Sequence, residues 1–189
     1  MSTAASTFAP ELQVSQWFNS HEPLTLAALR GRVVVLHAFQ MLCPGCVSHG
    51  LPQASKAREV FPESEVSVIG LHTVFEHHDV MTAAALKVFI HEYRLQFPVG
   101  IDQPAAHGSL PLTMQAYELP GTPSLVLIDR QGRIRLNHFG HIEDLALGAL
   151  VGRLMTESDS AAPGAGHTRA DLLGAPALGA CDDEACPSS

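Results

Sequence analysis

The sequence predicts an α/β fold in which a central mixed β-sheet is flanked by helices on both faces. Residues 32–39, "RVVVLHAF", are rich in β-branched residues and apolar on both faces, which is typical of a central strand covered on two sides. Strand and helix patterns then alternate as far as residue 97, which indicates parallel strands joined by right-handed crossovers. A later pair of strand patterns separated by a short turn indicates an antiparallel hairpin, so the sheet is mixed.

The first half of the chain reads as strand, helix, strand, helix. A helix is predicted over 44–58, with Pro44 at its first position, where a missing N–H is harmless, and with a kink at Pro52. The next strand is predicted over 66–71, followed by the loop "FEHHD" and a helix from about residue 80. The apolar face of this second helix comprises Leu86, Phe89, Ile90, Tyr93 and Phe97.

The second half contains shorter elements. "FPVGID" predicts a short edge strand and "LTMQAYEL" a short helix. "SLVLID" and "RIRLNHF" are the two strands of the hairpin, with Asp129 and Gly132 in the turn between them. Apolar residues at helical spacing over 142–155 predict a final helix.

Length and composition indicate one globular domain followed by a tail. The chain has 189 residues, of which 46% are hydrophobic and 16% charged, enough for one domain with a sizeable core. We assign this domain to residues 8–156. Residues 157–189 contain eight Ala, four Gly and three Pro without a sustained apolar period, and we expect them to form a flexible tail.

The charge balance excludes several classes of partner. With 11 Lys and Arg and a formal net charge of −8, the chain offers no basic surface to nucleic acid or to an acidic membrane. The first residues lack the basic and apolar regions of a signal peptide, and no stretch reaches the roughly 18 apolar residues of a spanning helix. We therefore expect a cytoplasmic protein that binds neither nucleic acid nor membrane.

Two cysteines, Cys43 and Cys46, stand one helical turn apart in "CPGC", directly after the predicted central strand. In a reducing compartment such a local pair is more often catalytic or metal-binding than structural. Free N–H groups and the positive end of the helix dipole stabilise a thiolate at a helix start. Because Pro44 has no N–H, the donors available to Cys43 are those of Gly45 and Cys46. We predict that Cys43 attacks and that Cys46, one turn into the helix, resolves the mixed disulfide.

With these features the chain resembles the thioredoxin-like superfamily, in particular its TlpA-like, redoxin (AhpC-TSA type) branch of thiol-disulfide oxidoreductases. The resemblance covers about residues 8–155. It depends on "WFN" and "PLTLAALRGRVVVLHAF" leading into "CPGC" between strand and helix, then "YELPGTPSLVLIDRQGRI", and then "HFGHIEDL" at the last helix. The resemblance implies a thioredoxin-like fold and protein or small-molecule thiols and disulfides as partners. No cofactor is expected, because the dithiol itself carries two electrons.

The resemblance also implies further site residues. Thr122 and Pro123 align with the family's cis-proline dipeptide, which lies against the cysteines, so they are expected to bind substrate together with Pro44 and Gly45. Phe39 and Leu42 stand where tryptophans are common in the family, and His37 stands where thioredoxins bury an acid. A histidine there could pass a proton to or from Cys46, or it could be a hydrogen-bonded core residue.

A peroxiredoxin-like thiol peroxidase is the first alternative, since peroxiredoxins share this fold. Their pattern places a threonine three residues before the peroxidatic cysteine, whereas this chain has Gln40 there. The nearby Cys46 also suits dithiol exchange better than a sulfenic acid that awaits a remote partner.

A second pair, Cys181 and Cys186, lies in "CDDEAC" near the end of the chain. The neighbouring carboxylates disfavour thiolates, so the pair is a weak attacker, but it could serve as a redox relay. A flexible coil from residue 157 reaches about 27 Å, which is enough to bring the pair to Cys43. A dangling tail disulfide is the other interpretation.

Metal binding is the remaining alternative, as in a zinc protein or a copper chaperone. Both cysteine pairs together could form a four-thiolate zinc site, although one pair has no evident scaffold. The loop "LHTVFEHHD" offers histidines and carboxylates on the same rim as Cys43. Adjacent His77 and His78 point apart on most backbones, so the loop is more readily explained as the frame of a substrate groove, or as the cap of the next helix through Asp79. We therefore predict no metal site.

Overall fold

A computed structural model describes residues 7–157, which form a six-stranded mixed sheet in the order β1-β4-β3-β2-β5-β6. The strands are β1 (Val14–Phe18), β2 (Val33–Phe39), β3 (Val66–His72), β4 (Val99–Asp102), β5 (Ser124–Ile128) and β6 (Ile134–Phe139). The helices are η1 (Cys46–Gly50), α1 (Leu51–Val60), α2 (Ala83–Glu92), α3 (Leu112–Ala116) and α4 (Asp144–Thr156). None of the helices in this part of the chain has the length and apolar character needed to cross a membrane.

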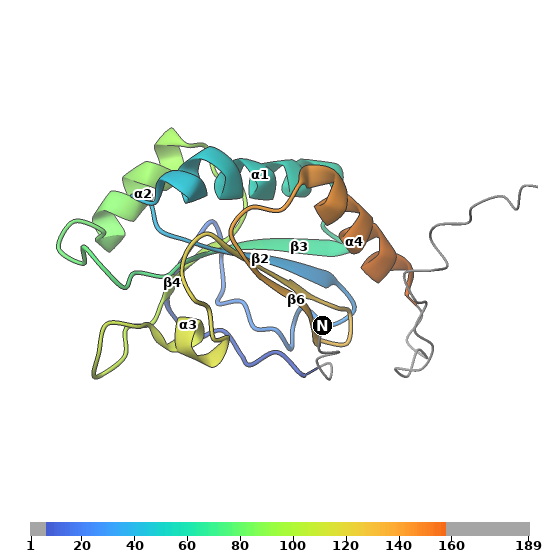
Figure 1. The fold of residues 1–189 in the computed structure, drawn as a ribbon, viewed down its shortest axis with the longest axis horizontal. Coiled ribbons are helices and arrows are strands. Elements are labelled where there is room, and N and C mark those ends of the chain that lie inside the picture. The colour runs from blue at the N-terminus through green and yellow to red at the C-terminus, as the bar shows by residue number, and fades with distance from the viewer. Residues whose placement is uncertain (1–6, 158–189) are drawn as a thin grey trace, which may run out of the picture. The chain divides into compact units, whose positions relative to one another are not determined.

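Helices cover both faces of the sheet, as predicted. Figure 1 shows α1, α2 and α4 on one face and the short α3 on the other. Alternate residues of β2 belong to the two hydrophobic cores that these layers enclose, Val33 and Val35 to one and Val34 and Leu36 to the other. All seven residues of β2 are buried, which accounts for a strand that is apolar on both faces.

The strand directions agree with the predicted mixture. β2 pairs in parallel with β3, and β3 with β4, as expected for crossovers through α1 and α2. β5 is antiparallel to both β2 and β6. Gly132 has φ +84° and Asp129 accepts hydrogen bonds from the main-chain N–H groups of Gln131 and Arg133, so the hairpin turn is made by the two residues that predicted it.

The prediction of "FPVGID" as an edge strand is wrong. β4 is flanked on its outer side by β1, which pairs with it in an antiparallel register that includes Trp17 opposite Gly100. Only part of β1 is enclosed, so its five residues carry no clear alternation of apolar and polar side chains. Its place in the sheet depends on pairing with a segment more than 80 residues further along the chain.

The helix after the cysteines begins at Pro44, as predicted, but changes its winding before Pro52. Cys46–Gly50 is π-helical, and the N–H of Leu51 bonds to the carbonyl of Cys46, five residues back. α1 then begins at Leu51 with Pro52 in its first turn, where a proline needs no hydrogen bond. The effect predicted as a kink is therefore a single π-helical turn ahead of the proline.

The second helix is shorter than its apolar pattern predicted. α2 begins at Ala83, and Thr82 rather than Asp79 caps it, accepting a hydrogen bond from the N–H of Ala85 at 3.2 Å. Glu92 is its last residue, and Arg94 follows with φ +52°. Phe97 is fully buried but belongs to the connection to β4 rather than to the helix.

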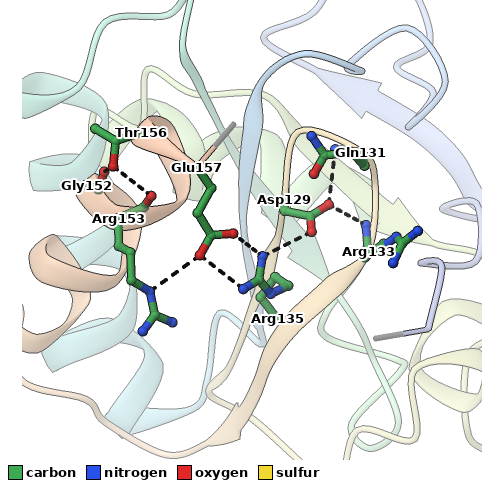
Figure 2. Close-up of polar contacts among 8 residues, drawn as sticks. All are labelled: Asp129, Gln131, Arg133, Arg135, Gly152, Arg153, Thr156 and Glu157. Carbon is green, nitrogen blue, oxygen red and sulfur yellow. Dashed lines mark hydrogen bonds and ion pairs between the residues drawn. The ribbon is translucent and has the colours of Figure 1, made fainter. Parts of the chain in front are cut away.

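The end of α4 is attached to the hairpin by a network of charges (Figure 2). Arg135 on β6 bonds to Glu157 with both terminal nitrogens and to Asp129 at 3.3 Å. Arg153 on α4 lies 3.6 Å from the same Glu157 carboxylate. This network holds residue 157 beside the hairpin turn, at the opposite end of β5 from Pro123.

Candidate active site

Cys43 and Cys46 lie at the start of the helix that follows β2, with unequal access to solvent. Cys43 is partly exposed, whereas Cys46 is completely buried, and both are free thiols. The N–H of Cys46 donates a hydrogen bond to Cys43 Sγ at 3.3 Å, the contact expected of a helix-start cysteine. Only Cys43 of this pair offers its sulfur to a substrate.

The loop before β5 packs directly on this pair. The Thr122–Pro123 peptide bond is cis, and the Thr122 carbonyl accepts a hydrogen bond from Cys43 Sγ at 3.5 Å. A Cβ at Gly45 would lie 3.3 Å from Pro123 Cδ, and one at Gly50 would lie 3.3 Å from Pro123 Cβ. Glycine at both positions thus lets the proline ring lie against the cysteine-bearing turn.

The Cys46 thiol is held in its protonated form. Burial, together with its hydrogen bond to Cys43, raises the pKa of Cys46 to about 12. Hydrogen bonds from the Gln40 main chain and the Thr122 side chain act in the opposite direction and favour the thiolate. Cys46 is therefore a protonated thiol, and a poor nucleophile, in the reduced protein.

His37 lies on the face of β2 that also carries Val33 and Val35, beneath the turn that carries the cysteines. Its Nδ1 is 3.8 Å from the position of a Cβ on Gly50, and its Nε2 is buried without a hydrogen-bond partner in the described part of the chain. Burial lowers the pKa of His37 to about 4, so the ring is neutral at physiological pH.

A groove of about 470 Å³ opens beside Cys43. It lies where β2 and β3 end and where β5 begins, since Phe39 pairs with His72 and Ala38 with Ser124 in the sheet. Its lining residues are Gln40, Leu42, Cys43, Pro44, Phe75, Glu76, His77, Val80, Met81, Gly121, Thr122 and Phe139. The prediction that the "FEHHD" loop frames a substrate groove agrees with this lining, which the loop residues 75–77 and Val80 help to form.

Several residues of the groove were missed by sequence reasoning. Phe139 comes from the end of β6 and packs over Gly121, where a Cβ would lie 3.0 Å from its ring. Gln40 was considered only as a departure from a peroxidase pattern, yet its buried side chain bonds to Glu76 and to the N–H of Phe75. An apolar residue at position 139 and a polar residue at the end of a buried strand are visible in the sequence. Neither indicates which distant segment its side chain contacts.

The metal-binding alternative and the second cysteine pair are considered separately. Within residues 7–157, no group of three or more His, Cys, Asp or Glu side chains is arranged to hold a metal ion. Cys181 and Cys186, predicted as a relay or as part of a zinc site, lie outside the described residues.

Comparison with known proteins places this chain in a family. Residues 6–137, well over half of the chain, match the AhpC/TSA family. The chain belongs to the AhpC/TSA family. Its thioredoxin-like fold is shared by the crystal structure of a thioredoxin-like superfamily protein that is 59% identical to it, with a TM-score of 0.79 over 81% of this chain and 99% of that one.

Two further proteins are similar to this chain. A thiol-disulfide isomerase from Corynebacterium glutamicum is 55% identical, with a TM-score of 0.76 over 79% of this chain and 98% of that one. Protein DipZ of Mycobacterium tuberculosis (strain CDC 1551 / Oshkosh) is 27% identical over 158 residues, or 79% of this chain. The chain spans about a fifth (21%) of the length of DipZ. The family match and the two similar crystal structures confirm the prediction of a thioredoxin-like redoxin.

Proposed function

We propose that this protein exchanges electrons with protein or small-molecule thiols and disulfides through Cys43 and Cys46. The observation that supports the proposal best is the pairing of a partly exposed sulfur, which receives the N–H of Cys46 at 3.3 Å, with a second thiol sealed beneath it. The groove beside Cys43 provides room for a substrate.

The proposed reaction has two steps. The Cys43 thiolate attacks one sulfur of a substrate disulfide, forms a mixed disulfide and displaces the other substrate sulfur as a thiolate. Cys46 then loses its proton and attacks Cys43 Sγ, which forms the Cys43–Cys46 disulfide and releases the second substrate thiol. The substrate gains two electrons and two protons, and the reverse sequence oxidises a dithiol.

The second step needs the buried Cys46 thiol to ionise at that moment. Once Cys43 is in a mixed disulfide, the hydrogen bond between Cys43 and Cys46 no longer raises the pKa of Cys46. The hydrogen bonds from the Gln40 main chain and the Thr122 side chain still favour the Cys46 thiolate. We assign Thr122 this positioning role in addition to substrate binding with Pro123, Pro44 and Gly45.

Of the two roles predicted for His37, burial supports the core residue rather than the proton shuttle, although its Nε2 lacks the predicted hydrogen bond within the described residues. A proton shuttle between Cys46 and His37 would form a buried ion pair. Burial raises the pKa of Cys46 and lowers the pKa of His37, so both shifts oppose this transfer in the reduced protein.

The environment of Gln40 supports disulfide exchange over peroxide reduction. Its side chain, 1% exposed, is engaged by Glu76 at 3.3 Å and by the N–H of Phe75 at 3.4 Å. No hydroxyl stands at this position to orient a peroxide next to Cys43.

Trapping of the mixed disulfide tests the proposal. In the triple variant Cys46→Ser/Cys181→Ser/Cys186→Ser, Cys43 can still attack but no other thiol of the chain resolves the adduct, so we expect a covalent substrate adduct on Cys43 and a turnover lower by about a hundredfold or more. Mass spectrometry of the unreduced protein identifies the modified residue. The matching variant Cys43→Ser/Cys181→Ser/Cys186→Ser should give no adduct, and an adduct on its remaining Cys46 would overturn the assignment of the attacking thiol.

A further inference from the structure

The groove beside Cys43 has a single carboxyl side chain among its lining residues. Glu76 supplies a carboxylate, His77 is the only other ionisable residue there besides Cys43, and no Lys or Arg lines the groove. The remaining wall is mostly apolar, with Leu42, Val80 and Phe139 each more than half exposed to solvent.

Glu76 is held in place relative to the cysteine-bearing turn. Gln40 donates from Nε2 to Glu76 Oε1 at 3.3 Å and accepts the N–H of Phe75 at 3.4 Å. Its main-chain carbonyl accepts the N–H of Cys43 at 3.1 Å. A single buried residue thus connects the acidic end of the groove with the attacking cysteine.

A carboxylate fixed in a groove with apolar walls attracts a cation and repels an anion. Apart from His77, the lining provides no side chain that can carry a positive charge, so a cationic group on a substrate would be attracted to Glu76. Apolar side chains at Leu42, Val80 and Phe139 suit the chain of a polypeptide or the stem of a lysine better than a small anionic disulfide.

We propose that Glu76 is a specificity-determining residue that directs Cys43 to polypeptide disulfides with a Lys or Arg beside the reacting cysteine. The inference rests on the proposed function and adds a substrate class to it. Because Glu76 is exposed, the preference is modest and falls as salt screens the charge.

The test uses two peptides that differ only in having Lys or Glu beside a single cysteine, each carried as a 2-pyridyl mixed disulfide. The Cys43 thiolate attacks the peptide sulfur, the bond to the pyridine sulfur breaks, and the released pyridinethione is followed by its absorbance. Reduced protein in excess gives single-turnover rates, so no added reductant is needed.

We expect the Lys peptide to react about two- to fivefold faster than the Glu peptide at low ionic strength. The overall negative charge of the protein also favours the Lys peptide, so the informative comparison is between Glu76→Gln and Glu59→Gln. Both variants lose one charge, but Glu59 is exposed on α1 and does not line the groove. Glu59→Gln should keep the preference and Glu76→Gln should lose it.

An equal preference in both variants, or none in the native protein, would overturn the role of Glu76. Reaction with neutral 2,2′-dithiodipyridine separates this outcome from failure of the proposed function. If Cys43 does not react even with that disulfide, the exchange chemistry itself is wrong. If Cys43 reacts normally with that disulfide, the exchange chemistry stands and only the specificity assigned to Glu76 is wrong.

Discussion

Two buried histidines show how the environment of a single residue decides its chemistry. His37 lies within β2 and His72 is the last residue of the adjacent parallel strand β3, and burial lowers the pKa of each to about 4. Both ring nitrogens of His72 lack a hydrogen-bond partner within the described residues, and its ring lies 5.2 Å from that of Phe39. Both side chains are therefore neutral members of the core at physiological pH.

This burial predicts a loss of stability in mild acid. An unfolded histidine binds a proton with a pKa of 6.5, and these folded ones with a pKa of about 4, so between those values the unfolded chain binds more protons. Stability is complete above pH 6.5 and falls as the pH drops toward 4. We expect the free energy of unfolding to fall by about 2 kcal/mol for each histidine between about pH 7 and pH 5.

Urea unfolding at the two pH values measures this fall. His72→Leu should remove about half of the contribution of the two histidines, because Leu does not titrate. His21→Leu, at an exposed position, should leave the fall unchanged. A pH dependence identical in native protein and His72→Leu would show that His72 is not held neutral.

At the scale of elements, one buried carboxylate joins three segments at the end of the sheet that carries the groove. Asp102, the last residue of β4, accepts the N–H groups of Thr113 and Met114 at the start of α3, at 2.8 and 2.9 Å. It also accepts the hydroxyl of Thr73, which directly follows β3, at 3.0 Å. A helix of only five residues is stable here because tertiary contacts, rather than its own length, hold it.

Removing this carboxylate should destabilise the protein. Asp102→Ala leaves three buried donors without an acceptor, so we expect the free energy of unfolding to fall by about 3 kcal/mol or more. Chemical denaturation measures the change, and Asp79→Ala, at an exposed loop position, should cost less than about 0.5 kcal/mol. Equal stabilities for the two variants would mean that the Asp102 contacts contribute nothing.

At the scale of the whole molecule, Glu157 and Cys43 lie at opposite ends of β5. Arg135 holds Glu157 beside the hairpin turn, whereas Cys43 lies at the other end of β5, next to Thr122 (Figure 2 shows the Glu157 contacts). Five residues of extended strand span about 17 Å. The 24 residues from Glu157 to Cys181 reach about 80 Å when fully extended, so the length of the chain permits the proposed relay.

A relay predicts a definite number of electrons per chain. With both pairs reduced, the full chain should reduce two substrate disulfides, the second through electrons passed from Cys181 and Cys186 to the Cys43–Cys46 disulfide. The Cys181→Ser/Cys186→Ser variant should reduce one. In Cys43→Ser the tail pair should reduce none, because its thiolates are disfavoured by neighbouring carboxylates. Titration of released thiols counts these equivalents, and one equivalent from the full chain would rule out the relay.

The sequence by itself predicted the mixed sheet and the order of the elements from β2 to α4, and it indicated dithiol exchange at "CPGC" as the chemistry to test. These follow from local signals: apolar periodicity, a proline at a helix start and a dithiol one turn apart. The loop after β3 was also predicted on the rim of Cys43, because parallel strands end at a common edge.

Only the tertiary structure decided which distant segments meet. It placed β1 outside β4, set Phe139 over Gly121, and joined Gln40 to Glu76 across 35 residues of chain to complete the groove. It also set the depth at which His37 and Cys46 lie, and hence the directions of their pKa shifts. Pairing, packing and desolvation depend on groups brought together from far apart, and the pattern within any one segment does not contain them.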